Sequence, residues 1–259
     1  MNISFIIINY RSRDFLEHCI ESIFKHADSF SFEIVIVNND ENPLEKISDS
    51  ANVKIVEHNV NKGFAEAANL GAKQSCGKVL FFLNADAEVL DPNIKDILTA
   101  FNDVPVGAAA PKLVLPDGSP QSWGAGCEVT TWNIIKNNLG FIESKGLWQA
   151  ENSQEIAWAS GAALAVSKEV FNECDGFDEN FFMYFEDVDL CKRIRNAGKK
   201  IMLLPHIKIL HIGGQSKSST KEQKKQYYES QDYYFKKHFG IFSVYTIKIL
   251  RNFVLFFTH

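Results

Sequence analysis

The chain has 259 residues, 46% of them hydrophobic, and a formal net charge of −5. This is enough for one large domain or two small ones with a sizeable core. No run of about 18 uninterrupted apolar residues occurs, which disfavours a transmembrane span, and the first residues lack the features of a signal peptide. The five scattered cysteines form no CxxC pair, which favours reduced thiols, a cytoplasmic location and no cysteine-based zinc site.

Charge is distributed unevenly along the chain. Residues 217–259 contain eight Lys and Arg against three Asp and Glu, whereas residues 1–216 contain 19 against 29. An acidic body with a basic tail suggests that the tail faces an anionic partner. Nucleic acid is not the expected partner, because the tail is rich in apolar residues as well as basic ones.

Strand patterns alternate with helix patterns over the first 110 residues. Buried strands are predicted at residues 3–8, 33–37, 53–57, 78–83 and 106–110. Helices are predicted after a capping box at residues 14–17, at residues 65–75, and from Asp91 and Pro92 onward. This alternation predicts an α/β fold with a mainly parallel central sheet and right-handed crossovers.

The order changes near residue 112. Residues 112–155 contain scattered glycines and three tryptophans, and we expect a long, partly irregular excursion there. Strand character returns at 156–166, and a helix capped by Gly198 is predicted at 186–197. Residues 200–204 and 207–211 are predicted to form two short strands or one strand bent at Pro205, and residues 221–238 a polar helix. We therefore expect one domain at 1–240 and an amphipathic helical appendage at 241–259.

The stretch at 78–86 combines a buried strand with an acidic turn. Its apolar residues end in Asn84-Ala85-Asp86, and open α/β sheets bind ligands beyond the carboxyl ends of such strands. A carboxylate there suits Mg²⁺, which takes one or two carboxylates plus phosphate oxygens and water. The alternative is that Asp86 only caps the turn.

His211 follows the last predicted strand, in the segment His211-Ile212-Gly213-Gly214. A neutral imidazole at this point would complete a metal site, which Mn²⁺ tolerates better than Mg²⁺. The alternative is a structural histidine with its hydrogen bonds satisfied. A metal site formed by Asp86 and His211 would take Mg²⁺ or Mn²⁺ as its cofactor.

Polar residues also follow other predicted strands. Asn38 ends the second strand, where polar groups can bind a base and ribose. Lys62 and Gly63 precede the helix at 65–75, which carries Asn69 and whose free N–H groups would suit an anion. Loop capping and an ordinary turn are the alternatives. Neither GxGxxG nor GxxxxGK[ST] follows the first strand, which disfavours a dinucleotide oxidoreductase and a P-loop NTPase.

Residues 176–190 are dense in aromatic and acidic side chains. Partial burial raises the pKa of a carboxylate towards the range in which it can act as a base. Asp187 is the candidate base in this block. It also lies at the predicted start of a helix, where capping or dipole complementation is the structural alternative.

These motifs, in this order, resemble the family 2 inverting glycosyltransferases and, within them, the rhamnosyltransferase-like branch. Each segment alone is weak, whereas the ordered set is specific and covers about residues 3–240. The segments are Ile7-Ile8-Asn9-Tyr10, Asn61-Lys62-Gly63-Phe64-Ala65, Phe82-Leu83-Asn84-Ala85-Asp86, Ser160-Gly161-Ala162-Ala163, residues 176–190 and His211-Ile212-Gly213-Gly214.

The resemblance implies a GT-A fold with a Rossmann-like nucleotide-binding half, an acceptor-side half and C-terminal helices. Asp86 matches the metal-binding end of the family's DxD-type motif, Asp187 its catalytic base, and His211 a residue near the metal and diphosphate. The nucleotide-sugar-binding residues expected are Asn9, Tyr10, Asn38, Lys62, Gly63, Phe64, Asn69, Asn84 and Ala85. The acceptor-binding residues expected are Trp158, Gly161, Phe182, Tyr184 and Glu186.

One position departs from the family pattern. Asn38 stands where the family usually has an Asp that accepts a hydrogen bond from the base N3–H. The amide oxygen of Asn38 can still accept this bond, but without charge. The departure puts donor affinity or base preference in question.

The expected reaction transfers a sugar, with inversion, from a nucleoside diphosphate to a hydroxyl of a cell-surface glycan or lipid-linked precursor. The preferred donor is dTDP-rhamnose, and UDP-sugars stay open. A sugar-nucleotide pyrophosphorylase is disfavoured, because residues 9–13 lack the glycines of its basic loop. A non-catalytic glycan- or nucleotide-binding module would have no need for Asp86, Asp187 and His211 together.

The C-terminal segment at 241–257 is mainly apolar, is interrupted by Lys248 and Arg251, and follows Lys236 and Lys237. A stretch this short and interrupted is poorly suited to cross a hydrocarbon core of about 30 Å. An amphipathic helix in peripheral contact with the anionic inner membrane face fits better. Packing on the catalytic domain, or on a second copy in a homodimer, is the alternative.

Overall fold

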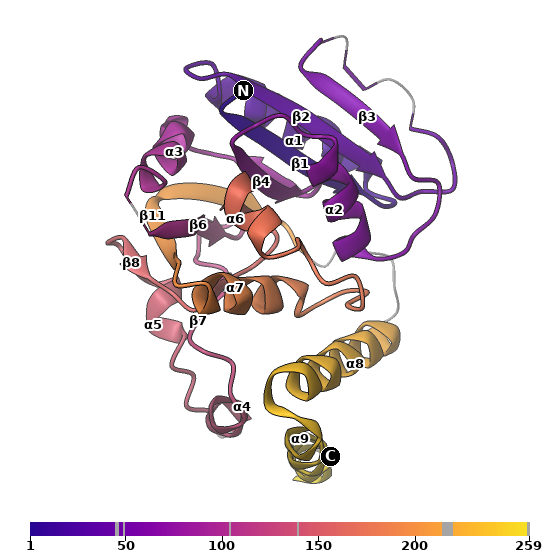
Figure 1. The fold of residues 1–259 in the computed structure, drawn as a ribbon, viewed down its shortest axis with the longest axis vertical. Helices are drawn as coiled ribbons and strands as arrows, with labels where there is room; N and C mark the ends of the chain where they lie inside the picture. Colours follow the sequence, from indigo (N-terminus) through magenta and orange to yellow (C-terminus); the bar gives the residue numbers. More distant parts are fainter. Residues whose placement is uncertain (45–46, 49, 104, 139, 214–219, 258–259) are drawn as a thin grey trace.

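The computed structural model describes all residues except 45–46, 49, 104, 139, 214–219 and 258–259, and shows helices on both faces of a central sheet (Figure 1). Its strands are β1 Ile3–Asn9, β2 Phe32–Asn38, β3 Val53–Glu57, β4 Val79–Asn84, β5 Ala87–Val89, β6 Val106–Val114, β7 Ala125–Gly126, β8 Gln154–Glu155, β9 Trp158–Ala159, β10 Ala163–Ser167 and β11 Lys200–His211. Its helices are α1 Arg13–His26, α2 Phe64–Lys73, the 3₁₀ helix η1 Pro92–Lys95, α3 Asp96–Ala100, α4 Thr131–Asn138, α5 Lys145–Trp148, α6 Lys168–Glu173, α7 Glu186–Asn196, α8 Thr220–Phe239 and α9 Ile241–Phe257.

Nine of the described strands form one mixed sheet in the order β3-β2-β1-β4-β10-β6-β11-β5, with β8 on β11. β1 pairs in parallel with β2 and β4, and β3 is parallel to β2. β10 is antiparallel to β4 and β6, and β5 is antiparallel to β11. The predicted mainly parallel sheet is confirmed, with antiparallel strands confined to the second half of the sheet.

The central strands β1 and β4 send alternate side chains to opposite faces of the sheet. Ile6 and Phe82 pack in one apolar cluster with α2, α6, α7 and α8. Phe5 and Phe81 pack in a second cluster with α1 and α3. Because helices cover both faces, both strands are apolar except at Ser4 of β1 and at their last residues, Asn9 and Asn84.

Two predicted helix starts have different outcomes. The capping box predicted at residues 14–17 is wrong, because α1 begins at Arg13 after Ser12 and has no side-chain cap bond. The Ser12 hydroxyl donates to Asn9 Oδ1 at 3.2 Å instead. The cap at Asp91 is confirmed, since its side chain accepts from the backbone of Asn93 at 2.8 Å, although the helix starts with the 3₁₀ turn η1.

The second half of the sheet differs from its predicted outline. The strand predicted at 156–166 is interrupted at Ser160, whose carbonyl accepts from the Ala163 N–H at 3.2 Å. This turn separates β9, which pairs with β7 in a small second sheet, from β10 in the main sheet. Residues 200–211 form the single strand β11, with an irregularity between Leu204 and Lys208 at Pro205, which has no N–H to donate.

The C-terminal helices α8 and α9 lie at one end of the molecule, far from β2 and β3 (Figure 1). α9 packs against α8 and α4. Its Val244 and Ile247 are buried, so one face of α9 belongs to the fold. Within the described residues, no helix combines the length and apolar character needed to cross a membrane.

Candidate active site

A cleft of about 980 Å³ opens at the carboxyl ends of β1 and β4. This is the edge of the sheet at which α/β folds bind ligands, and the volume suits a small-molecule site. Segments from both halves of the chain line it, namely residues 84–86, 121–123, 158 and 160–162, 183–188, His211 and parts of α4, α8 and α9.

Asp86 follows β4 and lines the cleft with a side chain that is 13% exposed. Its Oδ1 lies 3.3 Å from His211 Nε2, and its Oδ2 accepts from the Gly213 N–H at 3.1 Å. Burial acts to raise the pKa of Asp86, but the hydrogen bond and charge of His211 and the Gly213 N–H hold it below its usual range. The group is therefore a carboxylate, which is the form that binds cations.

Two amide side chains orient His211. Its Nδ1 lies 2.9 Å from Gln121 Oε1, and its Nε2 lies 3.1 Å from Asn84 Nδ2. Because an amide oxygen only accepts, these orientations place the ring proton on Nδ1. The hydrogen bond to Asp86 needs a proton on Nε2 as well, whereas metal binding needs the neutral ring, in which Nε2 carries a lone pair that a cation would take over from the Asn84 amide.

The pair of Asp86 and His211 fits two neighbouring ligands of a divalent cation. With metal–ligand bonds of about 2.1 Å, adjacent octahedral ligands are about 3.0 Å apart, and the carboxylate oxygen and Nε2 are 3.3 Å apart. Oxygen and imidazole ligands together suit Mn²⁺. In the part of the chain that the structure describes, no three His, Cys, Asp or Glu side chains are arranged to hold a metal ion, so substrate oxygens and water would complete the shell.

Asp187 lies in the first turn of α7 and lines the same cleft. Its Oδ2 accepts from the Gly161 N–H at 2.9 Å, and its Oδ1 accepts from the Val188 N–H at 2.7 Å. Desolvation by the surrounding protein raises the pKa of Asp187, while the two N–H groups act to lower it. A partly exposed carboxylate with fixed orientation and a raised pKa is suited to take a proton.

Glu186 borders Asp187 and is buried, with 7% of its surface exposed. Its Oε2 finds no hydrogen-bond partner among the described residues. Burial, and next the charge of Asp187, raise the pKa of Glu186 well above its usual value, which favours the neutral acid. A buried polar atom without a partner at the wall of a cleft indicates a contact that a ligand can make.

The loop before α7 is held in an unusual backbone conformation. Tyr184 and Phe185 have φ values of 69° and 67°, in the left-handed region that is costly for bulky residues. The Phe182 carbonyl accepts from the Phe64 N–H at 3.0 Å. A Cβ at Gly63 would lie 2.3 Å from that carbonyl oxygen, so only glycine permits this approach. The start of α2 thus holds the backbone at Phe182, shortly before α7 begins.

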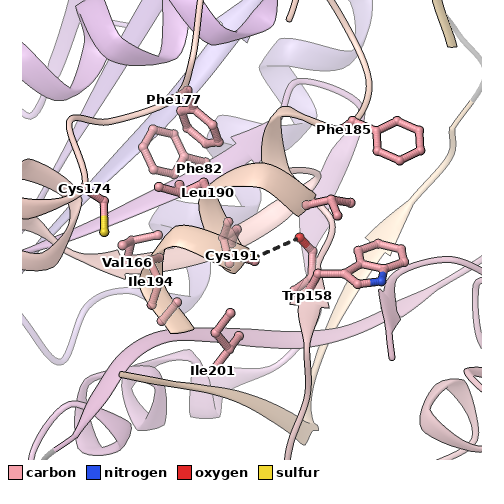
Figure 2. Packing of buried hydrophobic residues seen from close by; sticks show 14 of the residues in the cluster. Phe82, Trp158, Val166, Cys174, Phe177, Phe185, Leu190, Cys191, Ile194 and Ile201 are labelled. Carbon is pink, nitrogen blue, oxygen red and sulfur yellow. Dashed lines mark hydrogen bonds between the residues drawn. The ribbon is translucent and has the colours of Figure 1, made fainter. Parts of the chain in front are cut away.

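The inner face of α7 fixes the helix from the other side. Leu190, Cys191 and Ile194 pack with Trp158 and Ile201, as Figure 2 shows. The Cys191 thiol donates to the Ala159 carbonyl oxygen at 3.9 Å (dashed line in Figure 2). Burial of each large apolar side chain contributes about 1.5–3 kcal/mol, and it keeps the start of α7 beside the turn after β9.

Most of the predicted site residues line the cleft, and five do not. Those that line it are Tyr10, Gly63, Phe64, Asn84, Ala85, Asp86, Trp158, Gly161, Tyr184, Glu186, Asp187 and His211. Those outside its lining are Asn9, Asn38, Lys62, Asn69 and Phe182.

Asn9 and Asn38 form a buried network at the ends of β1 and β2. Asn9 Nδ2 donates to Asn38 Oδ1 at 2.8 Å. Asn38 Nδ2 donates to Glu57 Oε2 at 2.7 Å and to the Asn42 carbonyl at 2.9 Å. These bonds connect three neighbouring strands, and the Asn38 oxygen that was expected to face a base is engaged by Asn9.

The other residues outside the lining also have protein partners. Lys62 pairs with Glu66 at 2.8 Å and its side chain is 54% exposed. Asn69 donates to the Phe177 carbonyl and accepts from the Phe177 N–H, both at 2.9 Å, which fastens α2 to the loop before α7. Phe182 is 37% exposed and contributes its backbone carbonyl to the contact with Gly63.

The cleft also contains residues that were not predicted as site residues. Among them are Ser12, Asn39, Asn61, Gln121 and Ser160 near the sheet, and Gln223, Tyr227, Tyr228, Gln231, Ile247 and Arg251 from α8 and α9. Tyr227 lies 5.9 Å from the Tyr184 ring, and the Arg251 guanidinium lies 4.0 Å from the Tyr228 ring centre. The concentration of tyrosines in α8 is the one sequence signal that could have indicated this wall.

The sheet order and the cleft at its edge define a GT-A fold. The structure of GalNAc-T7 with UDP, GalNAc and Mn²⁺ is similar, with a TM-score of 0.65 at 17% sequence identity. The similarity covers 91% of this chain and 50% of that chain.

The chain belongs to glycosyl transferase family 2, whose model matches residues 4–152. Over 225 residues it is 30% identical to the O-antigen biosynthesis protein RfbC of Myxococcus xanthus. Over 229 residues it is 25% identical to the N-acetylglucosaminyl-diphospho-decaprenol L-rhamnosyltransferase of Mycobacterium tuberculosis. Each match covers 80% of this chain, but the chain spans 17% of the first relative and 74% of the second.

Proposed function

We propose that this protein transfers a sugar from a nucleoside-diphosphate donor to a hydroxyl of a glycan or lipid-linked glycan, with inversion. One observation carries the proposal: a single cleft is lined both by the Asp86–His211 pair and by the Glu186–Asp187 pair. The first suits a metal-bound diphosphate, and the second suits an attacking hydroxyl. Membership of family 2 supports the reaction class.

The metal would be Mg²⁺ or Mn²⁺, held by Asp86 Oδ1 and His211 Nε2. Bound there, it would neutralise charge on the leaving diphosphate. Gln121 would keep the His211 proton on Nδ1, and the Gly213 N–H would hold the second oxygen of Asp86. The presence of Mn²⁺ in the GalNAc-T7 structure supports the choice of cofactor.

Asp187 is the proposed catalytic base. The N–H groups of Gly161 and Val188 hold its two oxygens, and its raised pKa makes it a better proton acceptor than an ordinary aspartate. It would take the proton of the acceptor hydroxyl as that oxygen attacks the anomeric carbon. Displacement from the side opposite the leaving group inverts the anomeric centre.

The acceptor would lie between Glu186 and the aromatic residues Trp158 and Tyr184, all of which line the cleft. Neutral Glu186 can donate one hydrogen bond to a sugar oxygen. On the donor side, Tyr10, Asn84 and Ala85 border the same space, as do Gly63 and Phe64.

The proposed donor is dTDP-rhamnose, and the M. tuberculosis relative named as a rhamnosyltransferase supports it. That relative's name also supports a lipid-linked diphosphate acceptor. A UDP-sugar donor is the alternative, to be decided by experiment. We further propose a cytoplasmic location, a catalytic unit at 1–240 and a helical appendage at 241–259.

Differential scanning fluorimetry with a panel of nucleotide sugars tests the proposal. A donor present at a concentration of a hundred times its Kd should raise the free energy of unfolding by about 2.7 kcal/mol and the Tm by several degrees. Among the nucleotide sugars, dTDP-rhamnose should give the largest Tm shift. The shift should vanish in EDTA and return with Mn²⁺. Stabilisation by a nucleotide sugar without any turnover in the presence of glycan acceptors would instead support a binding module.

A further inference from the structure

Large apolar side chains are exposed at the end of the molecule formed by α4 and α9. Phe242, Tyr245 and Ile249 of α9 are 83%, 59% and 69% exposed. Trp132 of α4 and Phe141, shortly after it, are 61% and 68% exposed. The two helices pack on each other, and Figure 1 shows both at the end far from β2 and β3. These five side chains are called the α4–α9 apolar surface below.

The two faces of α9 differ in exposure. Val244 and Ile247 are buried against the fold, with 6% and 1% exposure. Phe242, Tyr245 and Ile249 lie three and four residues apart and therefore share the opposite side of the helix. The helix thus carries more apolar surface than the fold covers, and such surfaces on soluble domains mark contact sites.

The charges around this surface are mainly positive. Residues 131–148 and 241–251 contain Lys136, Lys145, Lys248 and Arg251 and a single acid, Glu143, which pairs with Lys136. Arg251 pairs with Asp232 of α8 and its side chain is 15% exposed, so the lysines are the cations that face outward. Lys136 Nζ lies 5.9 Å from the Trp132 ring centre. Lys248 reaches Asp232 at 3.3 Å, yet its side chain stays 54% exposed. Aromatic rings beside lysines are typical of segments that lie at a bilayer interface.

We propose that the α4–α9 apolar surface docks on the headgroup region of an anionic bilayer. The apolar side chains would enter the boundary of the acyl chains, and the lysines would face anionic headgroups. A second copy of the chain fits less well, because a two-fold contact would bring like charges together with few acids between them.

Docking would place the active-site cleft beside the membrane. The same two helices line the cleft, through Ile134 of α4 and Ile247 of α9. A lipid-linked acceptor would then reach the cleft without leaving the bilayer; this consequence rests on the proposed function, whereas docking itself does not.

Co-sedimentation of the full-length protein with vesicles tests the proposal. Binding is expected to vesicles of phosphatidylcholine with phosphatidylglycerol, and much less to phosphatidylcholine alone. The variant Phe242→Ser/Tyr245→Ser/Ile249→Ser should bind at least about tenfold more weakly. Leu90→Ser removes a side chain that is 46% exposed outside the surface, and it should bind as the wild type does.

A second measurement needs no change in α9. Brominated lipids should quench Trp132 fluorescence on docking, and Trp132→Phe should remove that part of the quenching. Wild-type protein that stays in the supernatant, or a triple variant that binds equally well, overturns the proposal. A dimer in sedimentation equilibrium that the triple variant dissociates, without vesicle binding, would assign the surface to a second copy. Donor-induced stabilisation measured without vesicles tests the proposed function separately.

Discussion

Buried polar side chains are paired at the carboxyl ends of β1 and β2 but left partly unpaired at the start of α7. At the sheet edge, the buried amides of Asn9 and Asn38 bond to each other and to Glu57. At α7, Glu186 Oε2 is left without a partner among the described residues, beside a cleft. The first arrangement holds strands together, and the second leaves a polar atom unpaired at the wall of the cleft.

The cost of the two arrangements also differs. A buried polar group without a partner costs about 1–3 kcal/mol, and a bulky residue in the left-handed region costs about 1–3 kcal/mol. Tyr184 and Phe185 have this conformation immediately before Glu186. Strain is therefore concentrated where we place catalysis, which is where proteins typically retain it.

The largest expected effect is on the α7 side. Asp187→Asn should lower the transfer rate by about 10²–10⁴, because the amide cannot take the acceptor proton. Donor affinity, measured by titration calorimetry, should stay nearly unchanged, since Asp187 is placed on the acceptor. Transfer at the wild-type rate would remove Asp187 from the mechanism.

The next effect is on the metal pair. Asp86→Ala should weaken donor binding about a hundredfold or more and abolish its dependence on Mn²⁺. Asp91→Ala, which removes a helix-capping carboxylate outside the cleft, is the matched control and should leave donor binding unchanged. The metal assignment fails if chelation does not alter wild-type donor affinity.

A smaller effect is expected one contact further from the metal. Gln121→Leu removes the acceptor for His211 Nδ1 and should weaken Mn²⁺ affinity about tenfold. Gln121→Glu keeps an acceptor oxygen and should lose less. The Mn²⁺ affinity of each variant can be measured by electron paramagnetic resonance. If Gln121→Leu and Gln121→Glu both bind Mn²⁺ as tightly as the wild type, Gln121 does not orient the imidazole.

The smallest effect on rate is expected at Glu186. If Glu186 acts as a neutral acid, Glu186→Gln keeps a hydrogen-bond donor and should retain transfer within about tenfold of the wild type. Complete loss of transfer in this variant would identify Glu186, rather than Asp187, as an ionised participant.

The pH dependence of stability provides a separate check on Glu186. Its pKa in the folded state is raised above an unfolded value of about 4.3. Between the unfolded pKa and the higher folded pKa, the folded state binds more protons than the unfolded state. Wild-type stability therefore falls as the pH rises through this range. The Tm of Glu186→Gln relative to the wild type should therefore increase with pH. Parallel Tm curves would contradict the raised pKa.

Local patterns were sufficient to predict the central strands and the start of α7. The apolar runs of β1 and β4 and the acidic start of the helix at Glu186 depend only on neighbouring residues. The pairing of Asn9 with Asn38 depends on strand register, which aligns the two residues across 29 positions of sequence. Taken one at a time, Asn9 and Asn38 were predicted to bind the nucleotide sugar, whereas in the structure their side chains bind each other.

Other features depend on contacts that no local pattern contains. Gln121 comes from an irregular segment without periodicity, so its contact with His211 could not be predicted. The left-handed conformations of Tyr184 and Phe185 occur at residues that rarely adopt them. The amphipathic character of α9 was predicted, but which side the fold covers depends on its packing against α4 and α8.

Proton NMR of the reaction products tests the central claim most directly. Wild-type protein is incubated with dTDP-rhamnose, Mn²⁺ and an N-acetylglucosaminyl-diphospho-lipid, with Asp187→Asn as the parallel sample. We predict a new glycoside whose anomeric configuration is inverted relative to the donor, formed by the wild type and not by the variant. A product of retained configuration, or the same product formed as fast by the variant, would contradict the assignment of Asp187 as the base of an inverting transfer.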